Sequence, residues 1–196
     1  TAREIGKLFV EVIVAPDCDA ETLSLFNRKK DLRLIRKPAT RSERPNLQFR
    51  SIDGAFLVQD ADTGTLRREE LRVVTVREPA ETLWPDLLFA WGCVKHVKSN
   101  AIVTAQECRL LGAGAGQTSR VDATRLAISK SRQPLAGAVL ASDAFIPFRD
   151  TLDLAADAGI AAVIQPGGSI RDEEVIDAAN TRGLAMVFTG RRHFRH

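Results

Sequence analysis

Residues 109–122 have the sequence Arg-Leu-Leu-Gly-Ala-Gly-Ala-Gly-Gln-Thr-Ser-Arg-Val-Asp, which leads from an apolar run through glycines into a helical pattern. Glycine permits positive φ and lets the backbone approach a ligand closely. Successive N–H groups at the start of a helix form an anion site, and Arg120 adds a fixed positive charge beside it. The stretch therefore predicts a strand-to-helix turn in an α/β fold, with a phosphate as the natural ligand.

The spacing of these glycines keeps a second explanation open. No Gly-Lys-Ser/Thr follows them, so the stretch is not a Walker loop, and it lacks the G-x-G-x-x-G spacing of a dinucleotide site. A tight turn without any ligand accounts for the same residues equally well.

Composition and charge limit the class of protein. The chain has 196 residues, enough for a substantial core, and its 44% apolar content is ordinary for a globular protein. A formal net charge of +3 is too small to indicate nucleic-acid binding but suits a small anionic ligand. The odd number of cysteines, without C-x-x-C, argues against a disulfide framework and predicts a cytoplasmic location. We find no signal peptide and no apolar run that could span a membrane.

The first part of the chain alternates strand and helix. A β-branched run, a helix with acidic residues early and basic residues late, and a second apolar run predict a parallel βαβ pair. A polar, proline-containing loop should follow, and then two strands in an antiparallel, hairpin-like excursion. The predicted ranges are 8–14, 19–26 and 32–35, the loop 38–46, and the strands 54–59 and 71–76.

The later part alternates more clearly. An apolar face predicts a helix over 86–98, with cations in its last turn. Ser119 and Asp122 have the spacing of an N-terminal cap, and Asp150 with Asp153, and Ser169 with Asp172, should cap two later helices. Glycines at strand ends mark the places where ligands bind in open sheets. The predicted strands are 100–104, 109–111, 137–140, 160–164 and 184–188, and the helices are 123–131, 150–159 and 169–183.

Several spaced motifs together resemble the C-terminal part of the AICAR transformylase family, the formyltransferase half of a bifunctional purine biosynthesis protein. The resemblance covers nearly the whole chain. The motifs are Val10–Pro16, Lys98-Ser-Asn-Ala-Ile-Val103, Gly114-Ala-Gly-Gln117, Ser119-Arg-Val-Asp122, Ala141-Ser-Asp-Ala-Phe145, Pro147-Phe148, Ile164-Gln-Pro-Gly-Gly-Ser-Ile-Arg-Asp172, Phe188-Thr-Gly190 and Arg192-His-Phe-Arg-His196.

The resemblance implies a cytidine-deaminase-like layered sheet with helices on its faces. Residues 1–45 would be the tail end of the first formyltransferase subdomain, and 46–196 the second, C-terminal subdomain. The chain would then be a C-terminal piece with one complete subdomain and part of another.

The resemblance also implies an activity. The family transfers a formyl group from 10-formyltetrahydrofolate to the 5-amino group of AICAR, the nucleotide precursor of IMP. It works as a homodimer with sites shared between subunits, and a monovalent cation such as potassium is expected near Ser99 and Asp143. Neither nucleic acid nor a membrane is an expected partner.

Site residues follow from the matched motifs. Asn100, Arg120, Phe145 and Arg192 match substrate-binding positions, and Val121, Pro147, Phe148 and Asp150 match positions near the folate. Structural explanations remain open for some of them: Asp150 as a helix N-cap, the two phenylalanines as core residues, and Pro166–Ser169 as a cap and turn.

The chain departs from the family at the catalytic residues. The family's catalytic Lys-His pair belongs to an upstream motif that is missing here, so no catalytic residue is assigned. Lys95-His96 is no substitute, because His96 is explained as a helix-end residue stabilised by the dipole. A non-catalytic nucleotide-binding or dimerisation fragment is therefore the alternative function. Zinc-dependent deamination lacks its ligands, because Cys18, Cys93 and Cys108 do not supply the required set.

Overall fold

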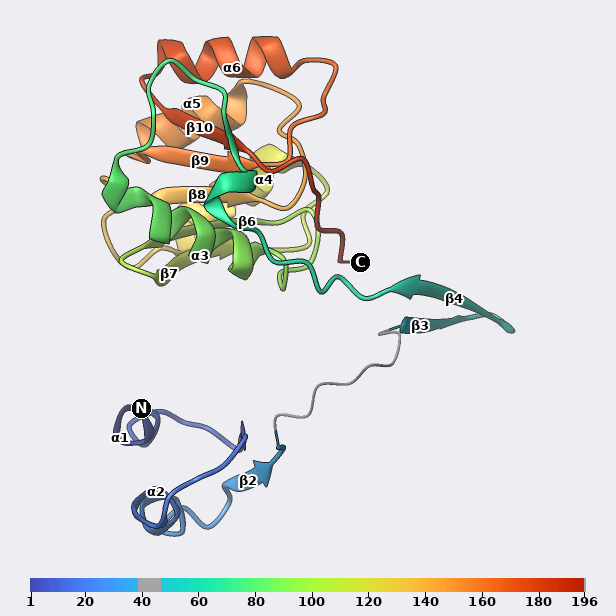
Figure 1. Cartoon of the computed structure of the whole chain (residues 1–196), viewed down its shortest axis with the longest axis vertical. Helices are drawn as coiled ribbons and strands as arrows, with labels where there is room; N and C mark the ends of the chain where they lie inside the picture. The colour runs from blue at the N-terminus through green and yellow to red at the C-terminus, as the bar shows by residue number, and fades with distance from the viewer. Residues whose placement is uncertain (39–46, 196) are drawn as a thin grey trace. The chain divides into compact units, whose positions relative to one another are not determined.

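The computed structural model describes residues 1–38 and 47–195, and the chain divides into two compact units, Thr1–Ala61 and Asp62–His196 (Figure 1). The predicted loop 38–46 lies outside the described residues except for Pro38, and His196 lies outside them too. The subdomain boundary at residue 45/46 stays a prediction, since the division into compact units concerns packing and not family subdomains.

The first unit begins with the predicted βαβ arrangement. After helix α1 (Ala2–Ile5) come strand β1 (Val12–Ala15), helix α2 (Ala20–Phe26) and strand β2 (Arg33–Arg36). The two strands are parallel, as the sequence predicts. Asp19 caps α2 by accepting a hydrogen bond from the N–H of Thr22 at 2.7 Å, which stabilises the first turn of the helix.

The first unit ends in an antiparallel hairpin of β3 (Leu47–Ile52) and β4 (Ala55–Asp60). The prediction that β4 pairs with the strand after it is wrong, because β4 pairs with β3, which the sequence analysis missed. Directly opposed residues of a hairpin share a face, so this register divides the hairpin into two different faces. One of them carries four exposed apolar side chains: Leu47, Phe49, Phe56 and Val58.

The second unit is a mixed α/β layer structure, as predicted. Its sheet has the strand order β5-β10-β9-β8-β6-β7, in which β8, β9 and β10 are parallel and the remaining pairings are antiparallel. The predicted strand 71–76 is reduced to β5, which pairs with β10 at the sheet edge. The elements in chain order are η1 (Arg68–Glu70), β5 (Arg72–Val73), η2 (Glu81–Leu83), α3 (Trp84–Val94), β6 (Ile102–Gln106), β7 (Arg109–Gly114), α4 (Arg120–Lys130), β8 (Val139–Ser142), α5 (Asp150–Asp157), β9 (Ala162–Gln165), α6 (Asp172–Thr181) and β10 (Ala185–Phe188).

Both faces of this sheet are covered. Successive strand residues point to opposite faces, and the two buried clusters follow that alternation. One cluster joins the sheet to α4, α5 and α6 through Ile102, Leu140, Val163 and Met186. The other joins it to α3 through Val103, Ala141, Ile164 and Val187. Figure 1 shows α3, in green, on one side of the sheet and the yellow to orange helices on the other.

Details at the ends of three helices differ from the prediction. Helix α5 begins at Asp150 itself, so Asp150 is the first helical residue and Arg149 is the N-cap. Helix α6 begins at Asp172, and its carboxylate accepts hydrogen bonds from the N–H groups of Gly168 and Ser169, at 2.7 and 3.1 Å. Helix α3 ends at Val94, so the cations at residues 95, 96 and 98 follow the helix and are not in its last turn.

Candidate functional site

Asp143, directly after strand β8, is the centre of a buried polar cluster. Its Oδ1 atom accepts hydrogen bonds from Arg120 Nη1 and from the N–H of Ala101 at 3.1 Å, and Oδ2 accepts one from Ser99 Oγ at 2.5 Å. The side chains of Arg120 and Asp143 are only 6% and 1% exposed. A charge pair this deeply buried requires that both charges be matched and hydrogen-bonded, which is the case here.

Arg120 links this cluster to Asn100. The guanidinium donates to the carbonyl of Ala101 at 3.1 Å and to Asn100 Oδ1 at 3.0 Å, in addition to Asp143. Asn100 Nδ2 in turn donates to the carbonyls of Gln117 and Thr118, at 3.0 and 3.2 Å. The structure therefore brings two predicted substrate residues into direct contact. The charge of Arg120 is matched by Asp143 and is not free beside the glycine stretch.

Part of the glycine stretch belongs to a strand and not to a turn. Gly112 and Gly114 lie in β7, where a Cβ atom would be 2.0 Å from the carbonyl oxygen of Ala127 and 1.9 Å from that of Ala123. These two glycines allow the strand to approach helix α4 closely. Gly116 does adopt a positive φ of 66°, but its N–H donates to the carbonyl of Lys98 at 2.7 Å.

The anion site predicted at this stretch stays a prediction. Its helix start behaves as predicted, since Ser119 Oγ accepts a hydrogen bond from the N–H of Asp122 at 3.1 Å. The N–H of Gln117 also lies 3.4 Å from the carbonyl of Asn100. The N–H groups of Gly116, Gln117 and Asp122 are thus bonded within the protein.

The C-terminal segment carries Arg192 on an exposed side. Its guanidinium lies 4.9 Å from the ring centroid of Phe194, within the range of a cation–π contact. His193, between them, is only 5% exposed, and its N–H donates to the carbonyl of Asp143 at 2.8 Å. The segment is therefore anchored beside the Asp143 cluster while Arg192 stays accessible.

The predicted folate residues mostly lie between β8 and the start of α5, in the same segment as the predicted substrate residue Phe145. Phe145 and Phe148 are 38% and 47% exposed, so neither is an ordinary core residue. Pro147 is half-buried, and Asp150 is exposed at the first position of α5. Val121 is half-buried near the start of α4.

Phe148 also has a neighbour that the sequence analysis did not single out. The guanidinium of Arg171 lies 4.9 Å from the ring centroid of Phe148 and makes an exposed ion pair with Glu174 at 3.4 Å. An accessible aromatic ring next to a cation suits a flat ligand that carries carboxylates.

A second group of residues that the sequence analysis missed surrounds His193. The imidazole lies 4.3 Å from the ring of Trp91, and its Nδ1 atom is hydrogen-bonded to Asp62 Oδ2. Lys95 Nζ lies 3.6 Å from the other oxygen of Asp62 and donates to the carbonyl of Gly64 at 3.0 Å. Asp62 and His193 are 131 positions apart, so no local sequence signal could have paired them.

Burial and neighbouring charge shift the pKa values of His193 and Asp62 in opposite directions. Burial lowers the pKa of His193, although Asp62 favours the protonated form and acts in the opposite direction. Burial by itself would raise the pKa of Asp62, but the hydrogen bond and charge of His193, together with Lys95, place it below its usual value. The arrangement therefore favours a neutral imidazole bonded to an ionised carboxylate.

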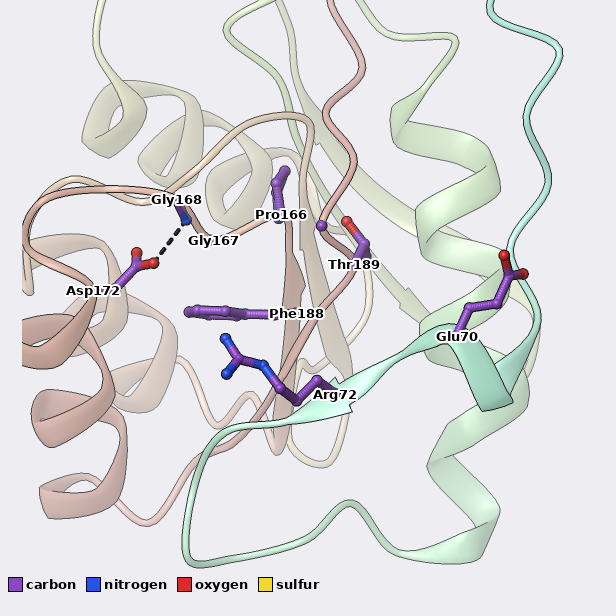
Figure 2. A pocket seen from close by; sticks show the side chains of 9 residues that line it. Glu70, Arg72, Pro166, Gly167, Gly168, Asp172, Phe188 and Thr189 are labelled. Atoms are coloured by element: carbon purple, nitrogen blue, oxygen red, sulfur yellow. Dashed lines mark hydrogen bonds between the residues drawn. The ribbon is translucent and has the colours of Figure 1, made fainter.

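A pocket of about 430 Å³ lies at the ends of β9 and β10, where the turn at Pro166–Gly168 follows β9 (Figure 2). The ring of Phe188 lies between this turn and the guanidinium of Arg72, which is 5.6 Å from the ring centroid. Both carboxylates at its rim are already engaged. Asp172 bonds the turn, and Glu70 bonds the N–H of Arg67 and the side chain of Arg191.

In the part of the chain that the structure describes, no three His, Cys, Asp or Glu residues are grouped so that they could hold a metal ion. Within the same residues, none of the helices has the length and apolar character required to cross a bilayer.

Comparison with known sequences identifies relatives along the whole chain. The family described as the AICARFT/IMPCHase bienzyme matches residues 1–130. The bifunctional purine biosynthesis protein PurH of Magnetococcus marinus is 55% identical over 207 aligned residues, and that of Caldicellulosiruptor saccharolyticus is 53% identical over 196. Both alignments cover 100% of this chain but only 39% and 38% of the relatives. The chain thus spans about two fifths of their length.

Comparison with solved structures finds more distant similarity. The apo dCMP deaminase from the cyanophage S-TIM5 matches with a TM-score of 0.40 and 13% identity, over 55% of this chain and 98% of that one. A deaminase/reductase of Thermotoga maritima, a diaminohydroxyphosphoribosylaminopyrimidine deaminase/5-amino-6-(5-phosphoribosylamino)uracil reductase, matches with a TM-score of 0.39 and 18% identity, over 55% of this chain and 35% of that one.

Proposed function

This chain belongs to the AICARFT/IMPCHase bienzyme family, and from that membership we propose that it forms part of an AICAR formyltransferase in purine biosynthesis. The reaction transfers the formyl group of 10-formyltetrahydrofolate to the 5-amino group of AICAR. One observation carries the proposal: a single buried residue, Asp143, connects the segments that bear Asn100, Arg120 and Arg192 through its carboxylate and its backbone carbonyl. The deaminase-like layering of the family and a cytoplasmic location are parts of the same proposal.

Arg192 is the residue best placed to bind the phosphate of AICAR. A phosphate dianion requires charge-assisted donors, for which a guanidinium is suited. Arg192 is exposed and its recorded neighbour is an aromatic ring, whereas Arg120 already has a carboxylate partner. Arg120 and Asn100, which are hydrogen-bonded to each other, would then form one wall of the nucleotide site and fix its geometry.

The folate would lie along the segment from Pro147 to Asp150, with Val121 beside it, while Phe145 would pack near the imidazole of AICAR. The exposed ring of Phe148 offers an apolar surface to a flat pterin. Arg171, next to Phe148, offers a positive charge to the carboxylates that folates carry. This part of the proposal predicts that Phe148 affects the folate KM more than the AICAR KM.

Formyl transfer also requires a base, because the 5-amino group is a poor nucleophile whose lone pair is delocalised into the ring and carboxamide. We assign this base to polypeptide outside the present sequence, since Lys95 is engaged with Gly64 and Asp62. Formyl transfer by the chain alone should accordingly be absent or very slow, although AICAR should still bind.

A monovalent cation near Ser99 and Asp143 stays a prediction of the resemblance. The oxygens in question do not present an open site, because Ser99 Oγ accepts from the N–H of Arg195 at 3.1 Å and donates to Asp143. Arg120 already neutralises the carboxylate. No step of the proposed reaction is assigned to an ion. A homodimer with shared sites likewise belongs to the proposal.

Two measurements test the proposed function. Calorimetric titration of the chain with AICAR should give saturable binding, which Arg192→Ala should weaken about tenfold, because one charge-assisted contact is lost. Lys7→Ala, which removes an exposed cation of the first unit, is the matched control and should bind like wild type. Absence of AICAR binding would contradict the proposal. Binding without formyl transfer, even in the intact polypeptide that contains this chain, would favour the alternative of a non-catalytic nucleotide-binding fragment.

A further inference from the structure

We propose that Asp62 and His193 are positioning residues that fix the C-terminal segment so that Arg192 faces the nucleotide. The inference rests on the proposed function, because it assigns a purpose to the anchoring of Arg192. Neither residue is among the positions matched to substrate or folate, although His193 belongs to the motif that contains Arg192.

Contacts of the C-terminal segment alternate along its length. His193 is buried, and the backbone of Arg195 bonds Ser99 twice, through its carbonyl at 2.8 Å and its N–H at 3.1 Å. Arg192, which precedes the first anchor, and Phe194, which lies between the two anchors, are exposed. An extended chain presents alternate residues to opposite sides, so fixing the side chain of His193 inward directs those of Arg192 and Phe194 outward.

The imidazole of His193 is held on several sides. The ring of Trp91 lies against it, the carboxylate of Asp62 bonds Nδ1, and Lys95 holds Asp62 through the second carboxylate oxygen. Trp91 belongs to helix α3, which packs on the sheet. The anchor therefore connects the segment to the core of the second unit through Trp91, and to the loop before η1 through Asp62.

His193 does not act on a ligand directly in this arrangement. Its Nε2 atom is buried and has no hydrogen-bond partner, and Nδ1 is occupied by Asp62. The backbone N–H of His193 bonds the carbonyl of Asp143, whose side chain holds Arg120. The influence of His193 on binding must therefore pass through the position of its neighbours, above all Arg192.

A double-mutant cycle on AICAR affinity tests this inference. Asp62→Asn removes the carboxylate that orients the imidazole and should weaken AICAR binding about tenfold, within the range of coupling between residues of one network. In the Arg192→Ala background the same substitution should change the affinity less than about twofold, because the residue through which it acts is gone. Asp157→Asn, which removes an exposed carboxylate bound to Arg182, is the matched control and should leave AICAR affinity unchanged.

Two further measurements distinguish positioning from a general loss of structure. In formyl transfer by the intact polypeptide that contains this chain, Asp62→Asn should raise the AICAR KM while kcat changes less than about twofold. Loss of folded protein would instead lower the apparent kcat at an unchanged KM. Hydrogen exchange should quicken at the amides of His193 and Arg195 but not at those of strand β6.

The outcomes separate this inference from the proposed function. If the wild-type chain binds AICAR and Asp62→Asn weakens binding equally with and without Arg192, the positioning role is overturned. The same holds if exchange at His193 and Arg195 is unchanged. If wild type binds no AICAR but exchange quickens as expected, the anchor exists and the proposed function fails. Should Asp62→Asn not fold, Asp62→Glu, which retains the charge, replaces it in the same cycle.

Discussion

Asp143 and Arg120 illustrate how one buried pair can support a whole site. Each charge is removed from water, and each is matched by the other and by neutral groups around it. Such a pair adds little net stability over an apolar substitute, but removing one partner leaves the other charge buried and unmatched. The pair therefore fixes the position of the Arg120 guanidinium, and with it that of Asn100, to which Arg120 donates a hydrogen bond.

We expect Asp143→Asn to destabilise the chain by about 3–5 kcal/mol, because it leaves the guanidinium of Arg120 without a counter-charge. Urea unfolding followed by circular dichroism measures this change. Glu107→Gln, in an exposed pair with Arg109, should cost at most about 1 kcal/mol. Equal effects of the two variants would show that Arg120 is not dependent on Asp143.

His193 should make stability depend on pH. Its pKa is lowered in the folded chain by burial, whereas the unfolded chain takes up the proton near pH 6.5. Protonation therefore favours the unfolded state. The contribution is complete above about pH 6.5 and is lost as the pH falls from there through the folded-state pKa. Urea unfolding between pH 8 and pH 5 should show this loss.

Two substitutions isolate the origin of that pH dependence. His193→Gln should remove the part of the slope that His193 causes. His96→Gln, at an exposed position, should retain the wild-type slope. A slope that survives in His193→Gln would assign it to another group.

Among the elements, the contact of β7 with α4 shows what a sequence can and cannot predict. The cap at Ser119 and Asp122 is local, since both partners lie within one turn of helix, and it is confirmed. Gly112 and Gly114 were interpreted as a ligand turn because the sequence does not show that helix α4 folds back against the strand. Their meaning depends on carbonyl oxygens of Ala123 and Ala127, which only the folded chain brings near.

We expect Gly114→Ala to destabilise the second unit by about 3 kcal/mol, because the added methyl group meets the backbone of α4 and forces the strand and helix apart. Gly92→Ala is the opposite control. Gly92 lies within α3 and has open space around a Cβ atom, so alanine should stabilise the helix by about 0.5–1 kcal/mol. Thermal unfolding of both variants measures the difference. A tolerated Gly114→Ala would mean that β7 and α4 can separate without loss.

Strand pairing was predictable only where partners are near in sequence. The βαβ arrangement of β1, α2 and β2 is confirmed, because a short crossover dictates a parallel pair. Strand β5 pairs with β10, over a hundred positions later, and the sequence offered no signal for that choice. Asn100 and Arg192 were assigned from local motifs. Asp62 was not, because its partner His193 lies 131 positions away.

At the scale of the whole molecule, the two buried clusters lie entirely in the second unit. That unit has both faces of its sheet covered, which is what a stable α/β layer structure requires. The first unit instead exposes an apolar face on its hairpin. A two-stranded hairpin has little stability by itself.

We expect a fragment of residues 62–196 to fold and to unfold cooperatively at a urea concentration close to that of the complete chain. A fragment of residues 66–196 loses Asp62 and the carbonyl of Gly64, and with them the bonds to His193 and Lys95. It should be less stable by about 1–3 kcal/mol. Failure of the longer fragment to fold would show that the second unit depends on residues 1–61.

The two tryptophans of helix α3 give the protein an intrinsic fluorescent probe of its own structure. The protein has no tyrosine and only Trp84 and Trp91, so emission excited at the red edge of the ultraviolet band comes from those two indoles alone. The guanidinium of Arg68 lies 4.3 Å from the centroid of Trp84, while the imidazole of His193 lies against Trp91. With Trp84 replaced by phenylalanine, the emission wavelength and intensity of Trp91 should report in real time whether the C-terminal segment is packed against α3. No attached dye is needed.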